Sequence, residues 1–97
     1  MSLWEISILK SIKLLGGEAK PKQICERLYA LPDFRQLLTD EHLRITYGRP
    51  TYYHQVRRRL TNLRRAGELK RILRGQPYSL TEKGIKRIDN EKEKTLS

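Results

Sequence analysis

The residue types that could do chemistry in this chain gather between Thr51 and Gly67, a segment with five arginines and no acid. Guanidinium groups this close repel one another, so the segment costs stability unless an anion approaches it. Residues 49–74 contain nine basic residues and one acid, a balance of +8, whereas the rest has 12 basic and 10 acidic residues, a balance of +2. This concentration is typical of a surface that binds a polyanion. The alternative is a solvated face that only keeps the protein soluble.

Catalytic and metal chemistry find little support in the sequence. His42 and His54 have no partner at a useful spacing, and we expect them to be surface or capping residues. Cys25 is the only cysteine, so it cannot form an internal disulfide, and we expect it at the edge of the core. Glu18 and Lys20 have the spacing of a nuclease Glu-x-Lys pair, but no Asp precedes them and a metal site needs more carboxylates. We therefore expect a protein that is not an enzyme and that needs no metal and no cofactor.

The basic segment must be positioned by other elements, and apolar spacing and turn residues indicate which ones. Proline and glycine divide the chain into short periodic segments. The expected elements, in order, are a helix over 3–15, a short extended segment at 18–20, a helix over 21–31, a short helix or ordered loop at 32–38, a short helix from 40 that holds Leu43 and Ile45, a turn at 47–50, a basic helix over 51–66, strands at 68–73 and 78–80, and a last helix from 82 to about 89.

Several residues are of types that begin or end helices. Thr39, Thr51 and Thr81 each precede a periodic segment and are expected to be N-caps. Gly67 is expected at the C′ position that ends the basic helix. The order of elements is that of a winged helix-turn-helix, a mainly α fold with a small β-hairpin as its wing. We expect one domain over 1–89, with Ile85 and Ile88 buried by the last helix, and a charged tail over 90–97 that frays because it has no apolar face.

The two sides of the basic helix differ in chemistry. Tyr53, Val56, Leu60 and Leu63 lie within about 80° of one another on a helical wheel and should pack on the other helices. The opposite side carries hydrogen-bond donors and no carboxylate, which suits phosphates and base edges in a major groove. We expect three groups of contacts. Bases would be contacted by Tyr52, Gln55, Arg58, Arg59 and Asn62, phosphates by Arg49, Thr51, Arg57, Arg64 and Arg65, and the DNA backbone or minor groove by the wing residues Lys70, Arg71 and Arg74.

Four short motifs resemble the N-terminal domain of Mrr-type restriction-system proteins. They are Gly-Gly-Glu at 16–18, Gly-Arg-Pro at 48–50, Leu-Arg-Arg-Ala-Gly at 63–67 and Tyr-Ser-Leu-Thr-Glu-Lys-Gly at 78–84. The resemblance covers residues 3–89 and implies a winged-helix DNA-binding domain, which in that family precedes a nuclease. Because the chain ends at Ser97, we expect no catalytic domain here. The resemblance therefore carries over only the fold and the basic helix and wing as the contact surface.

These patterns together predict a stand-alone module that binds double-stranded DNA, as a transcription regulator or as a targeting module of a restriction system. We expect it in the cytoplasm, associated with the nucleoid, because no signal peptide and no apolar run of about 18 residues is present. A homodimer through the first or last helix is possible. Two alternatives remain open: RNA binding through the same face, and a protein-docking winged helix that uses an apolar patch within residues 29–38.

Overall fold

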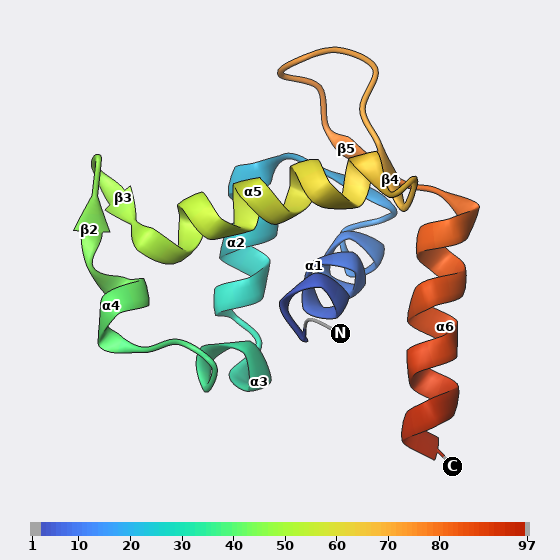
Figure 1. Ribbon diagram of the computed structural model, residues 1–97, viewed down its shortest axis with the longest axis horizontal. Coiled ribbons are helices and arrows are strands. Elements are labelled where there is room, and N and C mark those ends of the chain that lie inside the picture. Colours follow the sequence, from blue (N-terminus) through green and yellow to red (C-terminus); the bar gives the residue numbers. More distant parts are fainter. Residues whose placement is uncertain (1–2, 97) are drawn as a thin grey trace.

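Apolar residues at helical spacing bring three helices together around one core. The computed structural model describes the backbone of residues 3–96 and the side chains of residues 4–91 (Figure 1). It is mainly helical with a small antiparallel sheet, as the sequence predicted, and it has a second, two-stranded sheet that the sequence did not predict. The elements in chain order are α1 (Leu3–Leu14), β1 (Glu18–Ala19), α2 (Pro21–Tyr29), α3 (Pro32–Arg35), α4 (Asp40–Leu43), β2 (Ile45–Thr46), β3 (Arg49–Pro50), α5 (Thr51–Arg65), β4 (Leu69–Lys70), β5 (Tyr78–Leu80) and α6 (Glu82–Leu96).

The core lies where α1, α2 and α5 meet, and α6 packs against α1. Burial of aliphatic side chains contributes roughly 1.5–3 kcal/mol each, so this cluster is the main source of stability. The short segment from Pro32 to Arg35 is a helix, and its Phe34 is buried against the core. The fully buried apolar residues are Ile8, Leu9, Ile12, Ile24, Leu28, Phe34, Val56, Leu60, Leu63 and Leu69.

A three-stranded antiparallel sheet, in the order β1–β5–β4, joins the beginning of the chain to the segment after α5. Ala19 pairs with Tyr78, and both side chains are buried. The predicted strand over 68–73 is shorter than expected, because β4 contains only Leu69 and Lys70. Residues 71–77 form a loop that Figure 1 shows projecting from the body of the molecule near the C-terminal end of α5.

A second sheet occupies the region where the sequence predicted only a turn. Strands β2 and β3 pair through Ile45 with Pro50 and Thr46 with Arg49. The two-residue connection has positive φ at Tyr47 (52°) and Gly48 (79°), as a type I′ hairpin turn requires. Gly48 meets this requirement without strain, whereas a tyrosine in the left-handed region costs free energy.

Three predicted helix ends, at Gly67, Thr81 and Thr39, have the expected hydrogen bonds. Gly67, with φ of 82°, ends α5 as predicted, and the N–H groups of Gly67 and Glu68 donate to the carbonyls of Arg64 and Leu63. The hydroxyl of Thr81 accepts from the N–H of Gly84 at 3.2 Å, so that cap is confirmed. Thr39 likewise accepts from the N–H of His42 at 3.4 Å.

Two predicted ends were wrong. Thr51 is the first residue of α5 rather than its cap, because its hydroxyl and its N–H both donate to the carbonyl oxygen of Arg44. Helix α6 continues to Leu96, past the end expected near Asp89, and Ser97 lies outside the described residues. Glutamate and lysine are good helix formers and no Gly or Pro interrupts residues 90–96, so propensity alone supports the extension.

Ile85 of α6 was expected to be buried but is 39% exposed, whereas Ile88 is buried as predicted. Leu15, which follows the end of α1, is exposed as well. Leu43 and Ile45 are also exposed, because α4 and β2 form a peripheral arm beside the core. Gly84 is one position where only glycine fits, since a Cβ there would collide with the carbonyl oxygen of Glu68.

Candidate nucleic-acid interface

Helix α5 has one buried and one outward side, as its sequence predicted. Tyr53, Val56, Leu60 and Leu63 are buried against the rest of the core. The opposite side presents guanidinium, amide and hydroxyl groups to solvent, without a carboxylate within α5. Its exposed members along the middle and the C-terminal half are Arg58, Asn62 and Arg65, with Gln55 and Thr61 half-buried.

The β2–β3 hairpin covers the N-terminal end of this outward side. His54 donates from Nε2 to the carbonyl oxygen of Thr46 at 2.7 Å, and the hydroxyls of Thr46 and Thr51 are 2.9 Å apart. Thr51 is therefore engaged within the protein, and its expected contact with a phosphate is not supported by this geometry. Sequence reasoning missed the hairpin cover, which moves the accessible part of the helix toward Gln55, Arg58 and Asn62.

A cavity of about 370 Å³ lies between the hairpin and α5. Tyr47, at the hairpin tip, is 93% exposed, and its ring centroid is 6.1 Å from that of His54 in an edge-on arrangement. Gln55 and Arg58 form the side of the cavity that belongs to the outer face of α5. The hairpin thus adds an aromatic edge to the polar surface of the helix.

Tyr52 was wrongly assigned to base contacts. Its side chain is buried, its ring stacks on Tyr29 at a centroid distance of 6.1 Å, and it meets the edge of Phe34 at 6.3 Å. Burial raises the pKa of its hydroxyl, so the group stays protonated. The apolar side of α5 is wide enough to take both Tyr52 and Tyr53, and neither side chain is free on the outer face.

Arg59 also lies away from the outer face. Its guanidinium is 5.3 Å from the centre of the Trp4 ring, and the residue is half-buried beside α1. Cation–π contact with tryptophan is a stabilising arrangement within the protein. We therefore remove Arg59 from the base-contact group. Gln55, Arg58 and Asn62 remain in it.

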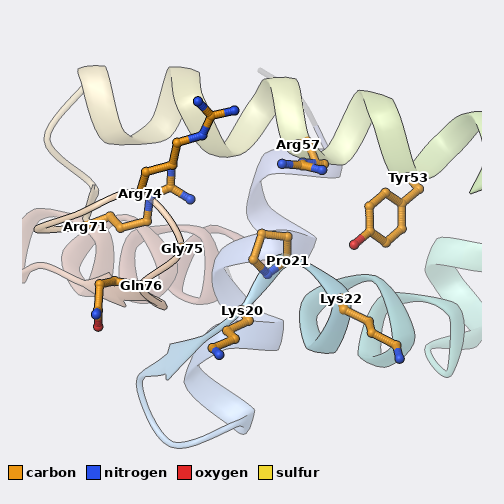
Figure 2. A pocket seen from close by; sticks show the side chains of 9 residues that line it. All are labelled: Lys20, Pro21, Lys22, Tyr53, Arg57, Arg71, Arg74, Gly75 and Gln76. Atoms are coloured by element: carbon orange, nitrogen blue, oxygen red, sulfur yellow. The ribbon is translucent and has the colours of Figure 1, made fainter.

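A second cavity, of about 320 Å³, lies where the beginning of α2, helix α5 and the 71–77 loop meet. Figure 2 shows the side chains that line it. Cationic side chains from all three elements line it, and Pro21 lies among them. Two of these, Lys20 and Lys22, were missed in the sequence, although two lysines flanking the first proline of a helix are a visible signal. The five cations that line this cavity are Lys20, Lys22, Arg57, Arg71 and Arg74.

A third cavity, of about 300 Å³, continues from this region along α5. Arg57, Arg71 and Arg74 line both cavities, and Arg58 and Thr61 connect the third to the outer face of the helix. Among the described residues that line these three cavities, none is acidic. The outer side of α5 and the two cavities beside the 71–77 loop therefore form one continuous positive surface, which we call the basic face.

The other predicted cations have different surroundings. Arg64 and Arg65 are exposed near the C-terminal end of α5. Arg49 is exposed, and its guanidinium lies 4.5 Å from the centre of the Tyr53 ring, which orients it beside α5. Lys70 stands apart, because its neighbours across the sheet are Ser79 and Glu18 rather than the residues of α5.

Carboxylates engage cations at some distance from the basic face. Glu68 is buried and accepts from Nη1 of Arg87 at 2.7 Å, while Nη2 of Arg87 is 3.8 Å from Glu5. This network ties α6 to α1 and to the residue that precedes β4. It explains why the only acid within residues 49–74 does not reduce the positive charge of the basic face.

Cys25 is part of the core, and His42 is part of a helix cap. Burial raises the pKa of the Cys25 thiol to about 12, so the thiol is protonated near neutral pH. His42 accepts on Nδ1 from the N–H of Thr39 at 2.9 Å and thus completes a cap. In the described part of the chain, no group of three or more His, Cys, Asp or Glu residues is placed to hold a metal ion.

Residues 3–96 contain no helix with the length and apolar character needed to cross a bilayer. Comparison of the chain with protein-family models, with curated proteins and with solved structures gave no match.

Proposed function

We propose that the chain is a winged helix-turn-helix module that binds double-stranded DNA through its basic face. Helices α2 and α5 would form the helix-turn-helix, α5 would lie in the major groove, and β4–β5 with the 71–77 loop would be the wing. A major groove about 12 Å wide accepts one α-helix. The basic face itself carries the proposal, since cations from three elements converge beside an exposed polar helix side with no acid among them.

The geometry suggests a division of roles within this face. Gln55, Arg58 and Asn62 project from the accessible part of α5, and amide and guanidinium groups can form paired hydrogen bonds with base edges. The cavity cations suit phosphate oxygens, which fix the register of a protein on the duplex. The motif resemblance to the Mrr N-terminal domain agrees with this assignment, and a regulator or a targeting module of a restriction system would both use it.

The first test is the salt dependence of binding to a mixed-sequence duplex, measured by fluorescence anisotropy. If about six phosphates are neutralised, affinity should fall on the order of a thousandfold between 50 and 200 mM salt. Binding that does not change over this range would exclude the proposal. Structured RNA in competition separates the two nucleic acids, because preference for RNA would replace the major-groove assignment with an RNA-binding one.

A pair of charge reversals makes the test specific to the basic face. Arg58→Glu alters the outer side of α5, whereas Lys86→Glu makes the same change in net charge on an exposed position of α6. We expect Arg58→Glu to weaken DNA binding by at least about tenfold at 100 mM salt, and Lys86→Glu to weaken it much less. Equal losses would mean that net charge alone governs binding. Thermal melts of both variants should stay within a few degrees of the parent, because both side chains are exposed.

A further inference from the structure

The 71–77 loop carries two adjacent apolar side chains that the protein does not cover. Ile72 is 90% exposed and Leu73 is 65% exposed. Single exposed apolar residues are ordinary, but these two neighbours stand directly before the turn at Arg74 and Gly75 that closes the projecting loop. We call this exposed apolar pair the tip. Covering such side chains by a partner is favourable, because it removes apolar area from water. The tip is therefore suited to insertion into an apolar environment.

The loop is braced rather than loosely extended. Arg71 lies 4.5 Å from the centre of the buried Tyr78 ring, which fixes the first residue of the loop against β5. The N–H of Gln76 donates to the carbonyl of Leu73 at 3.0 Å, and Gly75 has φ of 90°, so a tight turn closes the tip. A loop held by these contacts can keep its shape when it inserts into a partner molecule.

The charges around the tip indicate its partner. Arg71 and Arg74 flank the apolar pair in the sequence, and both line the two cavities that they share with Arg57 of α5. The acid near the pair is Glu18, which accepts from the Ser79 hydroxyl and shares a small cavity with Lys70, Arg71 and Ile72, so cations outnumber it there. A partner that contacts the basic face therefore also meets the tip. Duplex DNA combines the required properties, because its surface is anionic while its stacked base pairs are apolar. Proteins that place an apolar wedge between base steps usually do so in the minor groove, next to arginine or lysine.

We propose that Ile72 and Leu73 form a wedge that enters the minor groove beside the segment held by α5, partly unstacks one base step and bends the duplex. This inference rests on the proposed function, and it adds a distortion of the DNA that binding alone does not require. Partial unstacking is unfavourable, and wider contact between the bent DNA and the basic face would offset it.

Ligase-catalysed cyclisation measures such a bend without knowledge of the target sequence. A mixed-sequence duplex of about 100 base pairs is shorter than the persistence length of roughly 150 base pairs and rarely closes into a circle on its own. We expect the protein to accelerate closure by about tenfold or more, as bending proteins lower the elastic cost. The double variant Ile72→Ser/Leu73→Ser should lose this acceleration while anisotropy shows that it still binds the same duplex within about threefold.

The matched control is Leu14→Ser/Leu15→Ser, which removes two exposed leucines at the end of α1 and should cyclise DNA like the parent. The wedge is rejected if the parent binds the duplex without accelerating closure, or if the Ile72/Leu73 variant accelerates it equally. A parent that binds no duplex at all would instead reject the proposed function, and the wedge with it.

Sedimentation with phosphatidylserine-containing vesicles tests a lipid surface as the alternative partner. Vesicle binding that needs Ile72 and Leu73, without any effect on cyclisation, would assign the tip to a lipid surface and overturn the wedge.

Discussion

At the scale of single residues, the burial of Cys25 lowers the reactivity of its thiol. Burial raises the pKa of its thiol from 9.0 to about 12 and outweighs Arg49 and Arg57, which act in the opposite direction. We expect the native thiol to react slowly with a disulfide reagent at pH 8 and to react fast once urea unfolds the chain. Rapid labelling of the folded protein would contradict the buried position.

The same shift has a defined effect on stability. Between pH 9 and 12 the unfolded chain releases the Cys25 proton while the folded chain retains it. The contribution of this thiol to the free energy of unfolding is therefore complete below pH 9 and is lost as the pH rises towards 12. Urea titrations at pH 8 and pH 10.5 should show this loss, and the loss should be smaller in Cys25→Ala. The comparison uses differences within each variant, because the alanine also removes packing at both pH values.

Tyr52 provides a second test at this scale. Its ring lies between Tyr29 and Phe34, so Tyr52→Ala should lower the free energy of unfolding by about 3 kcal/mol, as expected for a buried aromatic residue. Asn62→Ala, on the outer side of the same helix, should change it by less than about 0.5 kcal/mol. Denaturant titration of both variants checks the contrast. A small loss for Tyr52→Ala would return this residue to the surface and to the base-contact group.

Periodicity predicted the core residues of α5 well, because the helical spacing of Val56, Leu60 and Leu63 is enough to place their side chains on the buried face. It failed at Tyr52, since adjacent tyrosines were expected to point to opposite environments. An apolar helix face is about 100° wide or more and can hold both. It also failed at Arg59, whose partner Trp4 belongs to another helix and cannot be found by local spacing.

At the scale of elements, the β2–β3 hairpin carries backbone strain at Tyr47. Non-glycine residues in the left-handed region cost on the order of 1 kcal/mol or more, and asparagine tolerates this region best. Tyr47→Asn should therefore raise the free energy of unfolding by about 0.5–1 kcal/mol in urea titrations. The same variant should weaken duplex binding, because it removes an exposed aromatic edge beside Gln55 and Arg58. Stabilisation without any loss of affinity would show that the hairpin tip takes no part in binding.

Element order was predictable from turn residues and apolar spacing, whereas the shortest elements were not. The strands of the second hairpin have two residues each, and their pairing depends on contacts such as the one between His54 and Thr46. Those contacts join the hairpin to α5, so the local spacing of residues 45–50 does not reveal them. The predicted contact of Thr51 with a phosphate was lost for the same reason, since its hydroxyl is taken by the carbonyl oxygen of Arg44.

At the scale of the whole molecule, the charge is separated into regions of different chemistry. The chain has a net charge of +10, and the ion pairs that join α6 to α1 and to Glu68, just before β4, use carboxylates that could otherwise have balanced the basic face. Unbalanced like charges destabilise the compact state through repulsion. Stability and nucleic-acid affinity therefore oppose each other on the basic face.

This opposition predicts the sign of the salt effect on the free protein. Raising NaCl from about 10 to 100 mM shortens the Debye length from roughly 30 to 10 Å and should screen the repulsion among the exposed arginines. We expect the melting temperature to rise by a few degrees, with sulfate more effective than chloride at equal ionic strength if the cavity beside Pro21 holds an anion.

Differential scanning calorimetry of the parent and of Arg57→Gln/Arg74→Gln measures both effects. The double variant should start from a higher melting temperature in low salt and respond less to sulfate, because two of the cations that line both cavities are gone. A melting temperature that falls with salt would mean that attractive ion pairs dominate the surface, and the basic face would then carry no stored repulsion for a polyanion to relieve.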